Sequence, residues 1–188
     1  MVFRDAFIDE PPYVTGIDVA GTAIKMVTLK RSAQGKPELV KATVHPLPVE
    51  IAEADETRRV ELLVEALKSA RQAHGITTLG KVVIGLPRER TTIRYVDLPS
   101  KNPAEIEEML MFDAERHVPL PLEEVQLSFT VIGQTEDSSK VKLAAAPIAQ
   151  IEALVDCFAK AGIEVNVVDV DVLAACASYS QERQDDTW

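Results

Sequence analysis

The feature that most constrains the fold is a succession of three strand patterns, all completed before the first helical pattern begins. Residues 13–19 are rich in strand formers, residues 23–30 alternate, and residues 38–45 resume the same character. Turn residues separate the three segments, which therefore predict an antiparallel meander at the start of the fold.

The second segment has the period of a half-buried strand. Ala23, Val27 and Leu29 fall on one side of it, and Lys25 interrupts that row. Gly21 in the preceding turn predicts that residues 13–19 and 23–30 form a hairpin.

A helix and a fourth strand complete the first pattern. Residues 57–74 carry apolar side chains at helical spacing, and Gly75 supplies a stop signal. The compact apolar run 81–86 then predicts a strand covered on both faces. The order is strand, strand, strand, helix, strand.

Beyond Pro87 the pattern starts again. Residues 91–98 predict a strand, and a helix follows in which Asn102 is the N-cap and Pro103 the first residue. This helix is rich in carboxylates, which are most simply explained by a solvent-exposed face. Asp113 is a candidate to pair with Arg116. Its buried stripe is predicted to contain Ile106, Leu110, Ala114 and Val118.

The rest of the chain adds strands and helices in a similar way. Residues 124–132 and 140–146 predict paired strands, and Pro147 begins a helix that ends near Gly162. A last strand and helix at 165–179 read as a return to the first unit. The fold class is therefore mixed α/β.

Charge excludes one class of function. The chain has 20 Lys and Arg against 30 Asp and Glu, a formal net charge of −10. Binding through nucleic-acid phosphates needs a basic surplus, so we expect no nucleic-acid partner. No apolar run approaches the ~20 residues that cross a bilayer, and the N-terminus lacks a signal-peptide core. We expect a cytoplasmic protein without direct membrane insertion.

Cysteine and histidine do not indicate a metal centre. Cys157 and Cys176 lie far apart outside any C-x-x-C pair, and we expect both to be buried apolar side chains. His45, His74 and His117 lack ligand spacing. No motif of a hydrolase or of a Walker-type ATPase occurs, so no catalytic residue is predicted.

One short segment could hold a phosphate. Asp18 ends a predicted strand, and Gly21 and Thr22 form the turn before Lys25. Such a turn can bring backbone N–H groups and a hydroxyl to a phosphate while the carboxylate holds hydrated magnesium. The competing interpretations are a plain hairpin, with Asp18 capping the turn, and a solvated or sheet-edge role for Lys25.

A second candidate site is a group of basic residues near the junction of the two predicted units. It consists of Arg88, Arg90, Arg94 and Lys101. We interpret it as a candidate partner surface, and the alternative is plain solubility or pairing with the acidic helix.

Several segments together resemble a known family. The stretch 16–25 resembles the first phosphate loop of actin-fold ATPases. The segments 94–99, 104–110, 115–120 and 125–129 resemble PilM, a family of actin-like assembly proteins of type IV pilus machines related to FtsA. The resemblance continues to about Ala177. It departs at Ala20, where the family's loop usually has glycine.

The resemblance implies an architecture. Residues 13–90 with 163–180 would form an RNase-H-like, actin-type subdomain, and residues 91–162 a small inserted subdomain of the FtsA and PilM type. Residues 1–12 and 181–188 would be tails. The actin-type clamp also needs phosphate and adenosine loops from a second half, which these residues do not include.

The resemblance also implies a function. By this resemblance, the protein would be an assembly protein that docks the cytoplasmic N-terminal tail of the membrane protein PilN in a groove involving both subdomains. Other pilus or secretion ATPase components would be further partners. One alternative is a module that binds ATP with magnesium and needs the missing half. The other is the cytoplasmic domain of a type II secretion L protein.

Overall fold

The protein has a mixed α/β fold, as predicted, and consists of two compact units with one sheet each. The computed structural model describes residues 12–32, 36–118 and 120–182, without the side chains of 113–115, 117 and 178–182. Unit A comprises the chain up to Pro87 and from Ala153 onward, and unit B comprises Arg88–Glu152. Unit B thus ends before the predicted 162. The predicted tails lie almost entirely outside the described residues.

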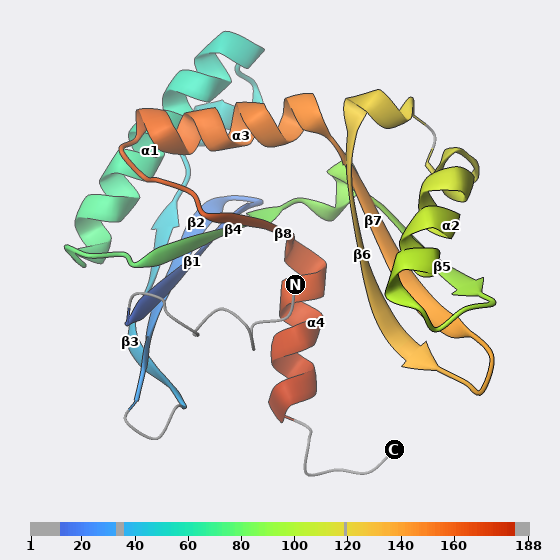
Figure 1. Ribbon diagram of the computed structural model, residues 1–188. Coiled ribbons are helices and arrows are strands. Elements are labelled where there is room, and N and C mark those ends of the chain that lie inside the picture. Colours follow the sequence, from blue (N-terminus) through green and yellow to red (C-terminus); the bar gives the residue numbers. More distant parts are fainter. Residues whose placement is uncertain (1–11, 33–35, 119, 183–188) are drawn as a thin grey trace. The chain divides into compact units, whose positions relative to one another are not determined.

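Unit A contains a five-stranded sheet in the order β3-β2-β1-β4-β8 (Figure 1). Its strands are β1 (Tyr13–Ala20), β2 (Ala23–Arg31), β3 (Pro37–Pro46), β4 (Lys81–Leu86) and β8 (Val167–Val170). The first three pair antiparallel, which confirms the meander. Strands β1, β4 and β8 are parallel, so their carboxyl ends lie along the same end of the sheet.

Three helices flank this sheet. In Figure 1, α1 and α3 lie above the sheet, while α4 lies below it next to β8. Among the described residues, no helix is long and apolar enough to span a membrane. The bounds are α1 (Glu56–His74), α3 (Ile148–Lys160), α4 (Asp171–Glu182) and a short 3-10 helix, η1 (Val49–Ala52).

Local signals explain where α1 begins and ends. The Asp55 carboxylate accepts a hydrogen bond of 2.8 Å from the backbone N–H of Arg58, a standard N-cap. Gly75 ends the helix in the left-handed conformation at φ 67°, and its N–H donates to the carbonyl of Arg71. The predicted stop signal is therefore confirmed.

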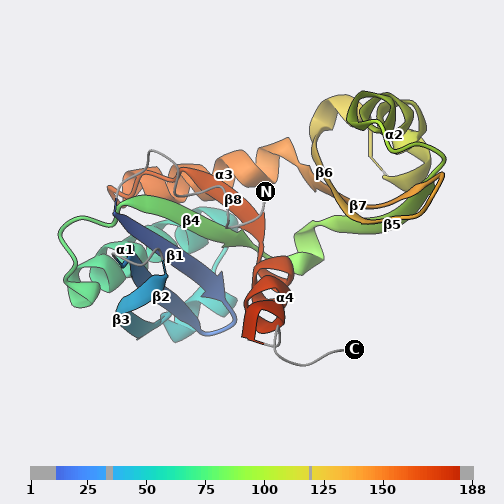
Figure 2. The ribbon, with the colours of Figure 1, turned by 60° about the horizontal axis from the view of Figure 1, so that its bottom comes forward.

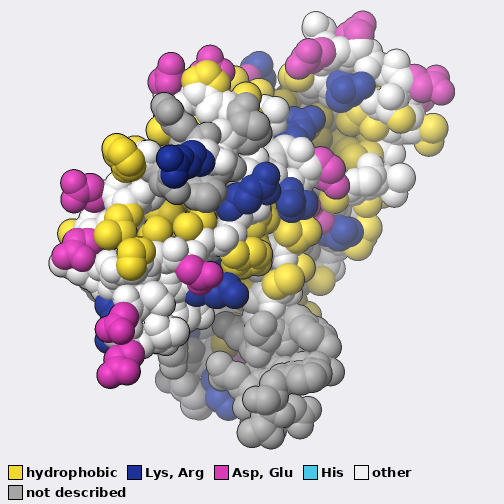
Figure 3. All heavy atoms as spheres, turned by 90° about the vertical axis from the view of Figure 1, so that its right-hand side faces the viewer, with side chains coloured by type: hydrophobic (Ala, Val, Ile, Leu, Met, Phe, Trp, Pro, Cys, Tyr) yellow, Lys and Arg dark blue, Asp and Glu magenta, His cyan; other side chains and the backbone are white. Residues whose placement is uncertain are grey.

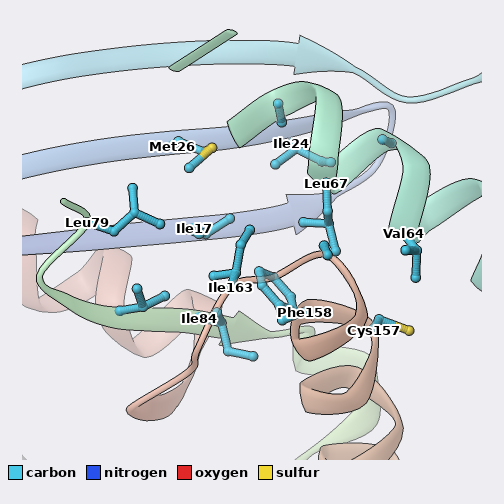
Figure 4. Packing of buried hydrophobic residues seen from close by; sticks show 14 residues of the cluster. Ile17, Ile24, Met26, Val64, Leu67, Leu79, Ile84, Cys157, Phe158 and Ile163 are labelled. Atoms are coloured by element: carbon cyan, nitrogen blue, oxygen red, sulfur yellow. The ribbon is translucent and has the colours of Figure 1, made fainter. Parts of the chain in front are cut away.

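The core of unit A lies between the sheet and the pair α1 and α3 (Figure 4). Ile17 and Ile24 project from the strands toward Leu67 of α1 and Phe158 of α3. Each is at most 2% exposed. Phe158 follows unit B in the sequence, so the chain returns to the first core after the second unit is complete.

The buried face of β2 differs from expectation. Ile24, Met26 and Thr28 are buried, whereas Val27 is 39% exposed and lies on the same side as Lys25. The row of Ala23, Val27 and Leu29 is thus the wrong row for the core face. A polar residue, Thr28, occupies the buried row because hydrogen bonds satisfy its hydroxyl.

A chain of hydrogen bonds surrounds the fully buried His74. Its Nε2 lies 2.8 Å from the Thr28 hydroxyl, and its Nδ1 lies 2.8 Å from the Thr43 hydroxyl. Thr28 in turn lies 2.8 Å from the hydroxyl of Thr15, which donates to the carbonyl of Leu79 at 2.6 Å. The chain connects α1 with β1, β2 and β3.

The directions of these bonds assign the histidine tautomer. Because the Thr15 proton goes to Leu79, Thr28 must donate to Thr15 and can only accept from His74. His74 therefore carries its proton on Nε2, and Thr43 donates to Nδ1. The neutral ring satisfies every member of this network.

Stability should depend on pH through His74. Burial, followed by the positive charge of Lys41, lowers the pKa of His74 below its ordinary value. The unfolded chain then binds more protons, so the free energy of unfolding should be constant above the unfolded pKa of about 6.5 and fall below it. Urea unfolding between pH 8 and pH 5 would show the effect. His74→Gln should reduce the fall in unfolding free energy between pH 8 and pH 5, whereas His45→Gln should leave that fall unchanged. The same pH dependence in His74→Gln as in the parent would contradict this assignment.

Unit B has a three-stranded antiparallel sheet that curves around one helix (Figure 2). The order β5-β7-β6 leaves one side of β5 and one of β6 without a strand partner in this sheet. The bounds are η2 (Arg88–Arg90), β5 (Thr92–Leu98), α2 (Pro103–His117), η3 (Leu122–Glu124), β6 (Val125–Gln134) and β7 (Ser139–Pro147).

The start of α2 is as predicted. The Asn102 carboxamide oxygen accepts from the N–H of Ala104 at 3.0 Å, which confirms the N-cap before Pro103. Ile106 and Leu110 are buried against β5 and β7, and Val118 is buried against β6 and β7. The side chain of Ala114 and the proposed Asp113 pairing lie outside the described residues.

The two cysteines differ in burial. Cys157 is 4% exposed in the core of unit A, as predicted, and burial raises the pKa of its thiol. Cys176 on α4 is exposed, so the expectation that both are buried is wrong for this residue. Apolar composition around position 176 does not determine which side of a helix faces the sheet.

Candidate functional site

The structure brings the four predicted phosphate-site residues together in one hairpin. Asp18 on β1 and Lys25 on β2 are directly opposite each other, and Lys25 Nζ lies 3.0 Å from Asp18 Oδ2. Gly21 and Thr22 form the two-residue turn, in which Gly21 has φ 60°. The Thr22 carbonyl accepts from the N–H of Leu47 at 2.8 Å.

The ion pair of Asp18 and Lys25 is accessible to solvent. The side chains are 35% and 54% exposed, respectively, and exposed pairs stabilise a fold by about 0–1 kcal/mol. A ligand can therefore displace either partner at small cost. Lys25 is solvated, but β2 lies inside the sheet rather than at its edge.

Two further carboxylates lie at the same sheet edge, and sequence analysis did not identify them as site residues. Asp169 lies one residue before the end of β8 and pairs with Gly85 of β4, and Asp171 begins α4. A Cβ atom placed on Gly85 would be 3.3 Å from the Cβ of Asp171 and 3.6 Å from Asp18 Oδ1. Gly85 is thus close both to the Asp18 carboxylate and to the Cβ of Asp171, which come from distant segments of the chain.

The residues around Asp18 could bind a phosphate together with a hydrated magnesium ion. Ligands of parallel sheets bind at the carboxyl ends of the strands, where Asp18 and Asp171 lie. Within the described residues, no three His, Cys, Asp or Glu side chains converge to ligand a metal directly. A magnesium ion at this edge would be held through its water molecules, with a phosphate near the turn.

The four basic residues do not form one cluster. Arg88 and Arg90 lie before β5, Arg94 lies within it, and Lys101 lies beyond its end. The seven residues of β5 span about 20 Å at ~3.3 Å each, which separates Lys101 from Arg90. On the face that Figure 3 draws, Lys and Arg side chains lie among acidic and hydrophobic ones.

Their hydrogen bonds also differ. Arg88 donates to the carbonyl of Thr91 at 2.8 Å, and Arg94 donates to the carbonyl of Ile93 at 3.0 Å. Arg90 and Lys101 are exposed and make no hydrogen bond or ion pair with a residue that the structure describes. These two side chains are the ones most available to a partner.

Comparison with protein families shows to which family the chain belongs. A family model described as type IV pilus assembly protein PilM matches residues 16–185. The chain belongs to the PilM family. The matched range includes the Asp18 hairpin, Asp171 and both sheets except the first three residues of β1, so the candidate phosphate site and unit B both lie within the part shared with PilM.

Two solved structures share this fold. A chain of a PilM-PilN type IV pilus biogenesis complex matches 92% of this chain with a TM-score of 0.76 and 22% identity. The cytoplasmic domain of EpsL, an inner membrane component of the type II secretion system of Vibrio cholerae, matches 86% with a TM-score of 0.52 and 19% identity. Both likenesses support the predicted actin-like fold.

The chain spans only part of these structures. It covers 51% of the chain from the PilM-PilN complex and 58% of the EpsL domain. The likeness alone therefore does not assign the activities and partners of those longer proteins to this chain.

Proposed function

We propose that this PilM-family chain is a cytoplasmic assembly protein of a type IV pilus machine, peripheral to the inner membrane, and that it docks the N-terminal tail of the membrane protein PilN. The match to the PilM family over residues 16–185 carries the proposal. The family model favours pilus assembly over type II secretion, to which the EpsL likeness points.

The structure offers means of peptide capture. Strands β5 and β6 each have one side without a strand partner in the sheet of unit B, and an extended peptide can pair with such an edge. Arg90 and Lys101 provide exposed cations at either end of β5. A tail paired with β5 would meet both of them.

Titration of the isotope-labelled chain with a synthetic PilN tail tests this function. We expect chemical-shift changes along β5 that saturate at or below millimolar peptide. Reversing the charges in Arg90→Glu with Lys101→Glu should weaken binding about tenfold if each contact contributes about 0.7 kcal/mol. The control is Arg58→Glu, an exposed arginine on α1 of unit A. No shift at millimolar peptide would contradict the proposal.

A second candidate function is weak binding of ATP with magnesium at the Asp18 hairpin. The observation that favours it is the approach of Asp18 and Asp171 across Gly85 at the carboxyl ends of the parallel strands. Asp18 would hold the hydrated metal, and Gly21, Thr22 and Lys25 would face the phosphates. Asp18, Thr22 and Lys25 supply only part of the metal, cationic donors and positioned water that phosphoryl transfer needs, so we expect no hydrolysis by these residues alone.

A fluorescent ATP analogue with magnesium tests this second candidate. We expect binding only above about 100 μM, since one half of a clamp supplies few contacts. Asp18→Asn should abolish it, and Asp97→Asn, an exposed carboxylate on β5 of unit B, should not. Equal binding by both variants would remove the hairpin from consideration.

A further inference from the structure

Helix α2 carries apolar side chains on two opposite sides. Ile106 and Leu110 are buried against the sheet of unit B, which curves around the helix in Figure 2. Met111 and Phe112 are 53% and 90% exposed. Phe112 is the most exposed large hydrophobic residue that the structure describes.

The exposed side chains form a continuous stripe. Ala104, Glu108 and Phe112 are exposed and follow one another at intervals of four residues, and the exposed Met111 lies three residues after Glu108, so the four share one side of the helix. We call these four residues the outer stripe. A single exposed hydrophobic side chain is common on protein surfaces and needs no explanation. The outer stripe has two large ones side by side, Met111 and Phe112.

Negative charge lies within the outer stripe, at Glu108, and beside it, at Glu107. Glu107 and Glu108 are exposed and make no hydrogen bond or ion pair with any residue that the structure describes. Glu105, in contrast, accepts a hydrogen bond of 2.6 Å from Ser100 at the start of the helix. Two unpaired carboxylates therefore lie beside the aromatic ring and the thioether.

We propose that the outer stripe docks a helical segment of a partner protein that carries apolar side chains flanked by Lys or Arg. Phe112 and Met111 supply an apolar anchor, and thioether side chains adapt to varied partners. Glu107 and Glu108 complement the partner's cations and set its orientation. The small side chain of Ala104 allows the backbones to approach closely at one end.

Charge argues against two other occupants. In a second copy of this chain, two outer stripes would bring Glu107 and Glu108 against the same residues, and like charges oppose that contact. An anionic lipid surface would repel the same carboxylates. This proposal does not depend on PilN docking, because it concerns a helix face rather than the edge of β5.

The test uses designed peptides on the full chain. The probe is a helix-forming peptide of about 15 residues with leucines on one face and lysines beside them, and its matched control has glutamates instead of lysines. Chemical shifts of the labelled chain report where each peptide binds. We expect the lysine peptide to perturb α2 at micromolar concentration and the glutamate peptide to bind at least tenfold more weakly.

Variants determine whether the outer stripe is responsible. Phe112→Ala should weaken the lysine peptide about tenfold, and Glu107→Lys with Glu108→Lys should weaken it further. Val49→Ala is the matched control, because Val49 is 89% exposed in unit A, and it should have no effect. The proposal is overturned if both peptides bind equally, if shifts occur away from α2, if Phe112→Ala binds normally, or if no shift appears.

Discussion

Replacing Gly80 by alanine should destabilise unit A by about 3 kcal/mol or more, the sum of left-handed strain and steric overlap. Gly80 has φ 68°, and a Cβ atom there would lie 1.9 Å from the backbone oxygen of Tyr13. Neither the oxygen of the first residue of β1 nor the turn into β4 can move without disturbing the pairing of these strands. Urea unfolding followed by circular dichroism measures the loss.

Two other glycines provide matched controls. Gly21 has φ 60° but open space around it, so Gly21→Ala should lose only the backbone strain, about 1 kcal/mol. Gly16 has ordinary φ and nothing within 4 Å of an added Cβ, so Gly16→Ala should be close to neutral. If Gly80→Ala is as stable as Gly16→Ala, the described approach of Tyr13 to Gly80 is wrong.

Phe158→Ala should destabilise unit A by about 3–5 kcal/mol, the range for removing a buried aromatic ring. Phe158 is 1% exposed and packs between α1 and the strands (Figure 4). It belongs to the part of the chain that follows unit B. A large effect therefore also shows that the residues after unit B complete the first core.

The chain contains its own control for this substitution. Phe112 is 90% exposed on α2, so Phe112→Ala should leave the unfolding free energy within about 0.5 kcal/mol of the parent. Thermal or urea unfolding of the two variants side by side gives the comparison. Equal destabilisation by both would contradict the described burial of these two rings.

Local signals explain why the order of elements could be predicted. Asn102 and Gly75 act within one turn of the backbone, and the structure confirms both. The hairpin at Gly21 follows from the same kind of short-range chemistry. These features depend on neighbours in the sequence, which can be read without a structure.

Features that depend on distant residues were not predictable. Thr28 is buried because His74, far along the chain, bonds to its hydroxyl, and a polar residue in an alternating pattern normally indicates the exposed row. The approach of Asp171 to Asp18 depends on the parallel order of β1, β4 and β8. One signal was present, since acids end the β-branched run at 165–170.

We propose that this chain of the PilM family binds a protein partner in preference to a nucleotide. Calorimetric titration of one sample with a PilN tail peptide and of another with ATP and magnesium, under identical conditions, tests it most directly. The peptide should bind at least tenfold more tightly than the nucleotide. Micromolar binding of ATP together with no heat from the peptide would contradict it.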